Sequence, residues 1–200
     1  MPQALITGRI LDEDGEPMPR ATVSVLTKRY PQGKPILMLV ASVNANDIGE
    51  YRVPDLNPGR YLVSANWRDY ASTVAAAPLD KPEEAYSATF YPSAKTDSLA
   101  QVVEVTAGQQ LPGIDIRMRK SQVFRIRGRV LPSGDAQPAG LILLRPIPRD
   151  QTFYLGYYGV PSVWAKKEGT FELAGITAGS YSISAFTQSS QDLLGKLVLK

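Results

Sequence analysis

The sequence repeats itself at a distance of 120 residues. The segment Ile6–Leu11, ITGRIL, returns as IRGRVL at Ile126–Leu131. The longer segment Gly49–Ala65, GEYRVPDLNPGRYLVSA, returns as GTFELAGITAGSYSISA at Gly169–Ala185. The two matches share one offset, which favours a duplicated unit over two unrelated coincidences. A period this long predicts tandem domains, because the repeats of solenoid proteins run about 20–50 residues.

Within each copy, apolar residues alternate with polar ones as they do in half-buried β-strands. In the segment ATVSVL, Val23 and Val25 share one face of the strand, and Thr22 and Ser24 share the other. The segments YLVSA and YSISA alternate in the same way, and glycine, proline and asparagine lie between such segments. No segment has a convincing helical period. The sequence therefore predicts an all-β fold with two tandem antiparallel β-sandwich domains.

The boundary between the two copies is predicted near Lys120. Residues 1–119 form the first sandwich in this interpretation, and residues 120–200 form the second. The second copy has no counterpart of residues 81–119, so we expect it to be truncated at its C-terminus. Residues 66–98 show no regular pattern; we favour a flap over the first sandwich, with a surface-binding loop as the alternative. Because the chain begins and ends within strand-like patterns, we expect it to be a piece of a longer protein.

The composition excludes several classes of site. The chain has no cysteine and no histidine, which excludes disulfides, thiolate nucleophiles, structural zinc sites and a Ser-His-Asp triad. Asp47, Glu50 and Asp55 gather around a turn rather than a cleft, so we expect no enzyme activity and no cofactor. A net charge of +3 is too small to indicate nucleic acid as a partner. No apolar run approaches the roughly 18 residues of a membrane span, and no signal peptide is visible.

Two motifs in the first copy resemble those of the carboxypeptidase regulatory-like domain family. They are GRILDEDGEPMPRATVSV at Gly8–Val25 and NDIGEYRVPDLNPGRYLVSA at Asn46–Ala65. The second copy departs from the family pattern, with Ala178 where the first copy has Pro58. For each copy the resemblance implies a transthyretin-like (prealbumin-like), Ig-like sandwich of the carbohydrate-binding-like fold.

The resemblance also implies a function, because members of this family are mostly non-catalytic accessory modules. On this basis we expect a spacer or docking unit of a larger bacterial envelope or secreted protein, which could also bind carbohydrate weakly. Its partners would be other domains of the same polypeptide, and glycans or envelope proteins. The expected location is the cell envelope or the extracellular space.

The stretch from residue 153 to residue 164 is rich in aromatic side chains and is the first candidate binding surface. It includes Tyr154, Tyr157, Tyr158 and Trp164. Aromatic residues on both faces of a strand suit a hairpin that contributes to the core and to a contact between domains. They also suit a dedicated carbohydrate-binding module, since exposed Tyr and Trp rings stack on sugars. The sequence leaves both interpretations open.

A row of arginines is the second candidate surface. Arg125, Arg127 and Arg129 alternate with other residues, so they are expected on one face of a strand. Such a row could contact acidic polysaccharide, lipid head groups or phosphates. It could equally protect an edge strand from pairing with another sheet.

A cluster of acids around Gly15 is the third candidate. Asp12, Glu13, Asp14 and Glu16 would supply the oxygen ligands that calcium prefers, as in a calcium-stabilised adhesion-type module. Turns between strands also favour aspartate, glycine and proline for backbone reasons alone. The aligned turn of the second copy keeps one carboxylate, so we favour a solvent-facing turn and predict no metal site.

Overall fold

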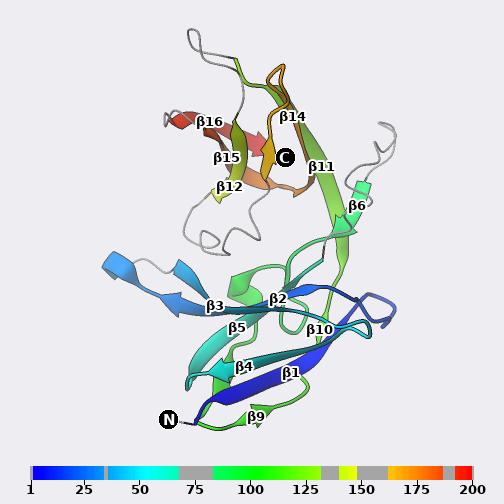
Figure 1. Cartoon of the computed structure of the whole chain (residues 1–200), viewed down its shortest axis with the longest axis vertical. Coiled ribbons are helices and arrows are strands. Elements are labelled where there is room, and N and C mark those ends of the chain that lie inside the picture. The colour runs from blue at the N-terminus through cyan, green and yellow to red at the C-terminus, as the bar shows by residue number, and fades with distance from the viewer. Residues whose placement is uncertain are drawn as a thin grey trace. The chain divides into compact units, whose positions relative to one another are not determined.

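The computed structural model describes residues 2–33, 36–67, 83–131, 140–147, 162–186 and 192–199. The chain divides into two compact units (Figure 1), unit 1 with residues 1–70 and 86–121, and unit 2 with residues 71–85 and 122–200. The described residues form β-strands joined by turns and two short 3-10 helices, η1 (Pro31–Gly33) and η2 (Asp97–Leu99). This confirms the all-β fold class. No helix among the described residues is long and apolar enough to cross a membrane.

Unit 1 is built from two sheets. Its described strands are β1 (Ala4–Leu11), β2 (Thr22–Arg29), β3 (Ile36–Asn44), β4 (Glu50–Leu56), β5 (Gly59–Asn66), β7 (Thr89–Phe90), β8 (Val103–Val105), β9 (Gln110–Leu111) and β10 (Ile116–Arg117). One sheet has the order β10-β1-β4, and β9 also pairs with β1. The other has the order β3-β2-β5-β7, and β8 also pairs with β5.

The core of unit 1 lies where the inward faces of its strands meet. Val23 and Val25 in β2 are fully buried, as their alternation predicts. Ile6 and Ile10 in β1 belong to the same buried cluster. The long strands pair antiparallel as expected, but β9 and β10 pair parallel with β1. These two short strands are parallel to β1 because residues 109–118 run beside it in the same direction as β1 itself.

Unit 2 also contains two sheets. Its described strands are β6 (Glu83–Tyr86), β11 (Lys120–Arg129), β12 (Leu141–Ile147), β13 (Ser162–Trp164), β14 (Thr170–Thr177), β15 (Gly179–Phe186) and β16 (Asp192–Leu199), with the end of β6 and the start of β11 counted in unit 1. One sheet has the order β14-β11-β6, and the other has the order β13-β12-β15-β16. Strand β6 comes from the segment that the sequence predicts to be an irregular flap, so part of that segment is regular structure.

The pairing of β11 with β14 repeats the pairing of β1 with β4, residue by residue. Ile6 lies opposite Val53, and Ile126 lies opposite Leu173. Both members of each pair are offset by the same 120 residues. The register also shifts at equivalent points, after Ala4 in β1 and after Phe124 in β11. Further equivalent pairs are Thr7–Arg52 with Arg127–Glu172, Gly8–Tyr51 with Gly128–Phe171, and Arg9–Glu50 with Arg129–Thr170.

A tyrosine fixes the corner before the next strand in each unit. The Tyr61 hydroxyl donates a hydrogen bond to the Asn57 carbonyl oxygen at 2.7 Å. The Tyr181 hydroxyl donates to the Thr177 carbonyl oxygen at 2.8 Å, again 120 residues further on. Both rings are largely buried. The hydroxyl therefore satisfies a carbonyl group at a turn that the core covers.

We predict that Tyr61→Phe and Tyr181→Phe each lower the free energy of unfolding by about 1 kcal/mol or more, because each removes the hydrogen bond to a partly buried carbonyl group. We expect the larger loss for Tyr181→Phe, since the Tyr181 hydroxyl also lies 3.0 Å from Oγ1 of Thr177. Urea denaturation of each variant measures the change. Tyr30→Phe is the control, since the Tyr30 side chain is 63% exposed. Equal stability of all three variants and the unaltered chain would contradict the prediction.

Candidate functional site

The aromatic stretch is only partly visible. Trp164 ends β13, an edge strand of the described sheet, and its side chain is 64% exposed. Tyr154, Tyr157 and Tyr158 lie outside the described residues. An exposed indole on a sheet edge is available for stacking with a flat ligand. Whether the neighbouring tyrosines contribute to the same surface stays a prediction.

Two arginines of the row in β11, Arg125 and Arg127, are engaged in ion pairs. The Arg125 guanidinium contacts both carboxylate oxygens of Glu83, with Nε at 2.8 Å from Oε2 and Nη2 at 2.9 Å from Oε1. Its Nη1 lies 2.7 Å from Oε1 of Glu172. The Arg125 side chain is only 14% exposed. Because the Arg125 guanidinium donates to two carboxylates of the same chain, we infer that it stabilises the fold.

The other two arginines are also bonded. Arg127 Nε lies 2.8 Å from Oε2 of Glu172, so one glutamate bridges two arginines. Arg129 Nε donates to the Glu168 carbonyl oxygen at 3.0 Å. Glu172 could have been expected from the repeat, because it lies opposite Arg127 in the register of the β11–β14 pair. No pattern in the sequence points to Glu83.

The ion pairs shift the pKa values of both kinds of group. The hydrogen bonds that Arg125 donates to Glu83, and then those to Glu172, raise the pKa of Arg125 above its ordinary value. Hydrogen bonds from Arg125, and then from Arg127, lower the pKa of Glu172 below its ordinary value. Both shifts favour the charged forms, as expected for a paired network.

The acidic turn uses its carboxylates to hold the backbone. One oxygen of Asp12, Oδ1, accepts hydrogen bonds from the backbone N–H groups of Asp14 and Glu16, each at 2.9 Å. The Glu13 carboxylate accepts the backbone N–H of Lys120 at 2.8 Å, at the start of β11. Among the described residues, no group of three or more acidic, histidine or cysteine side chains is placed to hold a metal ion. The oxygens of Asp12 and Glu13 thus bind amide groups of the chain.

Two aromatic rings lie beside this turn. The rings of Trp67 and Tyr86 meet edge to face with centroids 5.7 Å apart. The Trp67 indole N–H donates to the Pro19 carbonyl oxygen at 3.1 Å, and Lys120 Nζ lies 5.4 Å from the centre of the Tyr86 ring. Burial is the main cause that raises the pKa of Tyr86. These contacts anchor both ends of the segment between Trp67 and Tyr86 to unit 1.

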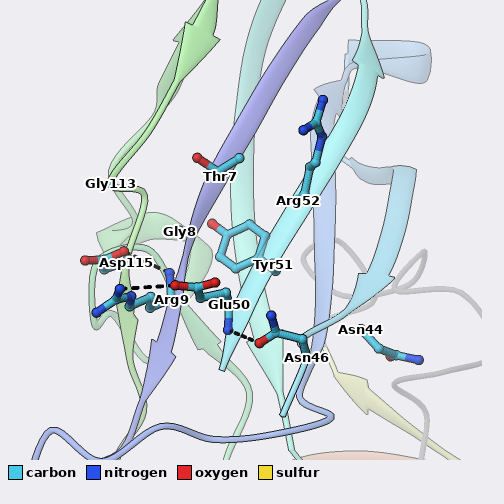
Figure 2. A pocket seen from close by; sticks show the side chains of 10 residues that line it. All are labelled: Thr7, Gly8, Arg9, Asn44, Asn46, Glu50, Tyr51, Arg52, Gly113 and Asp115. Atoms are coloured by element: carbon cyan, nitrogen blue, oxygen red, sulfur yellow. Dashed lines mark hydrogen bonds and ion pairs between the residues drawn. The ribbon is translucent and has the colours of Figure 1, made fainter. Parts of the chain in front are cut away.

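An open polar hollow lies on the β1–β4 side of unit 1 (Figure 2). It has a volume of about 700 Å³, and sequence reasoning did not identify it. Arg9 Nη2 lies 3.1 Å from Oε1 of Glu50, and the Asp115 carboxylate accepts the Arg9 backbone N–H at 2.8 Å. Its remaining lining residues are Thr7, Gly8, Asn44, Asn46, Tyr51, Arg52 and Gly113. The two carboxylates are thus already bonded within the fold, so the hollow offers no free acid pair.

The chain belongs to the carboxypeptidase regulatory-like domain family, whose pattern matches residues 5–119, more than half of the 200 residues. The match begins in β1 and ends just after β10, so it includes most of unit 1. A comparison with curated proteins finds no match.

Several solved structures resemble the chain at low identity. A streptococcal ancillary pilin is 13% identical with a TM-score of 0.35, and the match covers 99% of this chain and 59% of that one. The shaft pilin SpaA of Lactobacillus rhamnosus GG is 9% identical with a TM-score of 0.31, covering 100% and 94%. The fimbrial anchor protein Mfa2 of Porphyromonas gingivalis is 12% identical with a TM-score of 0.30, covering 98% and 83%. Likeness at this level carries no inference about function.

We predict that Asp12→Ala lowers the free energy of unfolding by about 1–2 kcal/mol, because two backbone N–H groups lose a charged acceptor. Asp14→Ala is the control, since Asp14 takes part in this turn through its backbone.

Thermal unfolding with added calcium and with a chelator should give the same midpoint for the unaltered chain. A calcium-dependent rise in midpoint that Asp12→Ala removes would show that the turn is a metal site.

We predict that Arg125→Met lowers the free energy of unfolding by about 1–2 kcal/mol, because it leaves two glutamates without their shared cation. Arg60→Met is the matched control. Arg60 lies 3.2 Å from Glu104, but both side chains are more than 70% exposed, so we expect no measurable change. Denaturant unfolding measures both variants, and equal losses would contradict a special role for Arg125.

The same network predicts a pH dependence. The pKa of Glu172 is lower in the folded chain than its ordinary value of 4.5, so the folded state binds fewer protons there. The stabilisation is therefore present above the ordinary pKa and is lost as the pH falls through the folded-state pKa. Glu172→Gln should remove this part of the acid dependence of the unfolding midpoint. An unchanged acid dependence in that variant would contradict the assignment.

Proposed function

We propose that the chain is a non-catalytic accessory module that acts as a spacer or docking unit within a larger bacterial envelope or secreted protein. The observation that supports this most is that charged side chains of the candidate sites are bonded to other groups of the same chain. Asp12 and Glu13 bind backbone amides, while Arg125 and Glu172 bind each other. Membership of the carboxypeptidase regulatory-like domain family supports the same proposal.

Residues 1–119 and residues 120–200 are proposed to be tandem copies of one module, with the second copy truncated at its C-terminus. These bounds come from the sequence repeat and differ from those of the two units, since residues 71–85 are counted in unit 2. The equal registers of β1–β4 and β11–β14 support this proposal. So do the equivalent corner tyrosines. A further sign is the left-handed backbone at Asp55, with φ 63°, since Gly175 has φ 71° at the equivalent place.

The proposed partners are other domains of the same polypeptide, and envelope proteins or glycans. The proposed location is the cell envelope or the extracellular space. Both proposals follow from the family resemblance, because its modules occur in tandem within large envelope proteins.

A second candidate function, carbohydrate binding, is favoured by one observation. The Trp164 side chain is 64% exposed at a sheet edge, where an indole face can stack on a sugar ring. In this alternative, Tyr154, Tyr157 and Tyr158 would extend the same platform.

One experiment separates the two candidates. A glycan array of neutral and acidic sugars is probed with the unaltered chain, with Trp164→Ala and with Tyr30→Ala as a control of matched exposure at 63%. If the chain is a spacer or docking unit, we expect no glycan signal, or a signal that Trp164→Ala leaves unchanged. A signal that Trp164→Ala abolishes and Tyr30→Ala keeps would overturn the spacer proposal in favour of carbohydrate binding.

A further inference from the structure

Two turns, one in each unit, share the same backbone hydrogen bonds. In unit 1 the Asn46 N–H donates to the Glu50 carbonyl oxygen, and in unit 2 the Lys166 N–H donates to the Thr170 carbonyl oxygen, each at 2.8 Å. The glycine before Glu50 and the glycine before Thr170 have a left-handed backbone, with φ 73° and 81°. Each glycine N–H donates back to the first residue of its turn, at 3.1 Å and 2.7 Å. The two turns are therefore equivalent in structure.

The first residue of the turn differs between the units. In unit 1, Oδ1 of Asn46 accepts the backbone N–H groups of Ile48 at 3.1 Å and of Glu50 at 2.8 Å. In unit 2 this place is taken by Lys166, whose side chain has donors but no acceptor. The lysine thus gives up two hydrogen bonds that asparagine makes at this turn. A residue that weakens its own turn is a candidate for a role outside the fold.

Lys166 follows an exposed tryptophan on the same side of the chain. The Trp164 side chain is 64% exposed, and Lys166 is also exposed. Val163 and Ala165 alternate with them and pack against the core of unit 2. This alternation places Trp164 and Lys166 together on the outward side. Lys167, the next residue of the turn, is exposed as well, and we call Trp164, Lys166 and Lys167 the Trp–Lys surface.

The Trp–Lys surface combines an apolar ring with positive charge. Lys166 and Lys167 are followed by one acid, Glu168, whose carbonyl oxygen accepts the Nε–H of Arg129 at 3.0 Å. The three basic residues outnumber the single carboxylate. A partner of this surface is therefore expected to be acidic, with an apolar group beside its carboxylates.

Unit 1 forms the same turn without these groups. The offset of 120 residues places Asn44, Asn46 and Asp47 at the positions of the Trp–Lys surface. The indole and the two ammonium groups are thus not required by the turn itself.

The acidic turn of unit 1 has the complementary chemistry. Asp12 and Glu13 accept hydrogen bonds from backbone N–H groups of the chain. Asp14 and Glu16 take part in the turn through their backbone N–H groups, and both residues are exposed. Pro17, which follows them, is exposed too. The turn therefore presents two carboxylates and an apolar ring.

We propose that the Trp–Lys surface of one copy of this chain binds the acidic turn of a second copy. The two lysines pair with the carboxylates of Asp14 and Glu16. The Trp164 indole packs against the Pro17 ring. The proposal rests on the proposed docking function, because it names a partner for it.

The proposed contact is heterologous, because its two surfaces differ and lie in different units. Each pair of copies keeps one surface of each kind for a further copy, so the association can continue. Exposed ion pairs contribute little individually, and the contact is small. We therefore expect a weak association that is lost on dilution and in salt.

The first test follows the NMR spectrum of the 200-residue chain at low salt, from about 0.05 to 1 mM protein. We expect resonances of residues 12–17 and 164–168 to shift together as the concentration rises. The shifts should disappear in about 1 M salt, where the Debye length is about 3 Å.

Two double variants test the pairing of the surfaces. One carries Lys166→Glu and Lys167→Glu, and the other carries Asp14→Lys and Glu16→Lys. We expect each variant alone to lose the concentration-dependent shifts, because its two surfaces then carry charge of the same sign. An equimolar mixture should regain the shifts, because surfaces of opposite charge then meet. All four residues are exposed, so the variants should keep the fold, which the dispersion of their spectra checks.

A single variant separates the surface from the fold. Lys166→Asn restores the side-chain acceptor of the turn, so it should raise the unfolding midpoint while weakening the association several-fold. Lys95→Asn is the control, since Lys95 is an exposed lysine of unit 1, and it should leave the association unchanged.

Four results would overturn the proposal. They are no concentration-dependent shift up to about 1 mM protein, shifts that either double variant keeps, a mixture of the two variants that stays unassociated, and shifts on charge reversal that do not depend on concentration. The last result would place the contact within one chain. The docking function fails separately, through a glycan signal that Trp164→Ala abolishes.

Discussion

The pairing of β1 on both of its edges is the constraint on which unit 1 depends. A buried central strand must have partners for its backbone groups on each side. Ile114 provides one of them, and Gly8 provides the room for it. The Tyr51 hydroxyl donates to the Ile114 carbonyl oxygen at 2.6 Å, and its burial raises the pKa of that hydroxyl. The same segment thus closes the sheet, completes the core and satisfies a buried tyrosine.

Several charged residues join segments that are distant in sequence. Glu13 bonds to the backbone of Lys120, 107 residues away, and Glu83 bonds to Arg125, 42 residues away. These bonds lie around the start of β11, where the chain passes from the first unit to the second. Through these bonds, members of the acidic cluster and of the basic row take part in the fold.

The repeat made much of the fold predictable. Alternation identified β2 and its buried face at Val23 and Val25, and the offset of 120 residues from β4 and β5 predicted strands where β14 and β15 lie. The position of Glu172 follows from the register opposite Arg127. Glu83 does not follow from any local pattern, because it reaches Arg125 through a segment whose sequence is irregular. The hollow beside Arg9 and Glu50 was also beyond prediction, since it depends on where residues 113–115 return along β1.

The sequence by itself determined the class of fold, the strand pattern of each unit and the family, because these depend on local alternation and on motifs of a few residues. Only the tertiary structure decided the roles of Asp12, Glu13 and Arg125, because hydrogen-bond partners far apart in the chain are set by the path of the backbone. It also decided which edge of each first strand is closed. That edge is filled in unit 1 by residues 109–118, and among the described residues of unit 2 its partner is β6, which comes from the preceding segment.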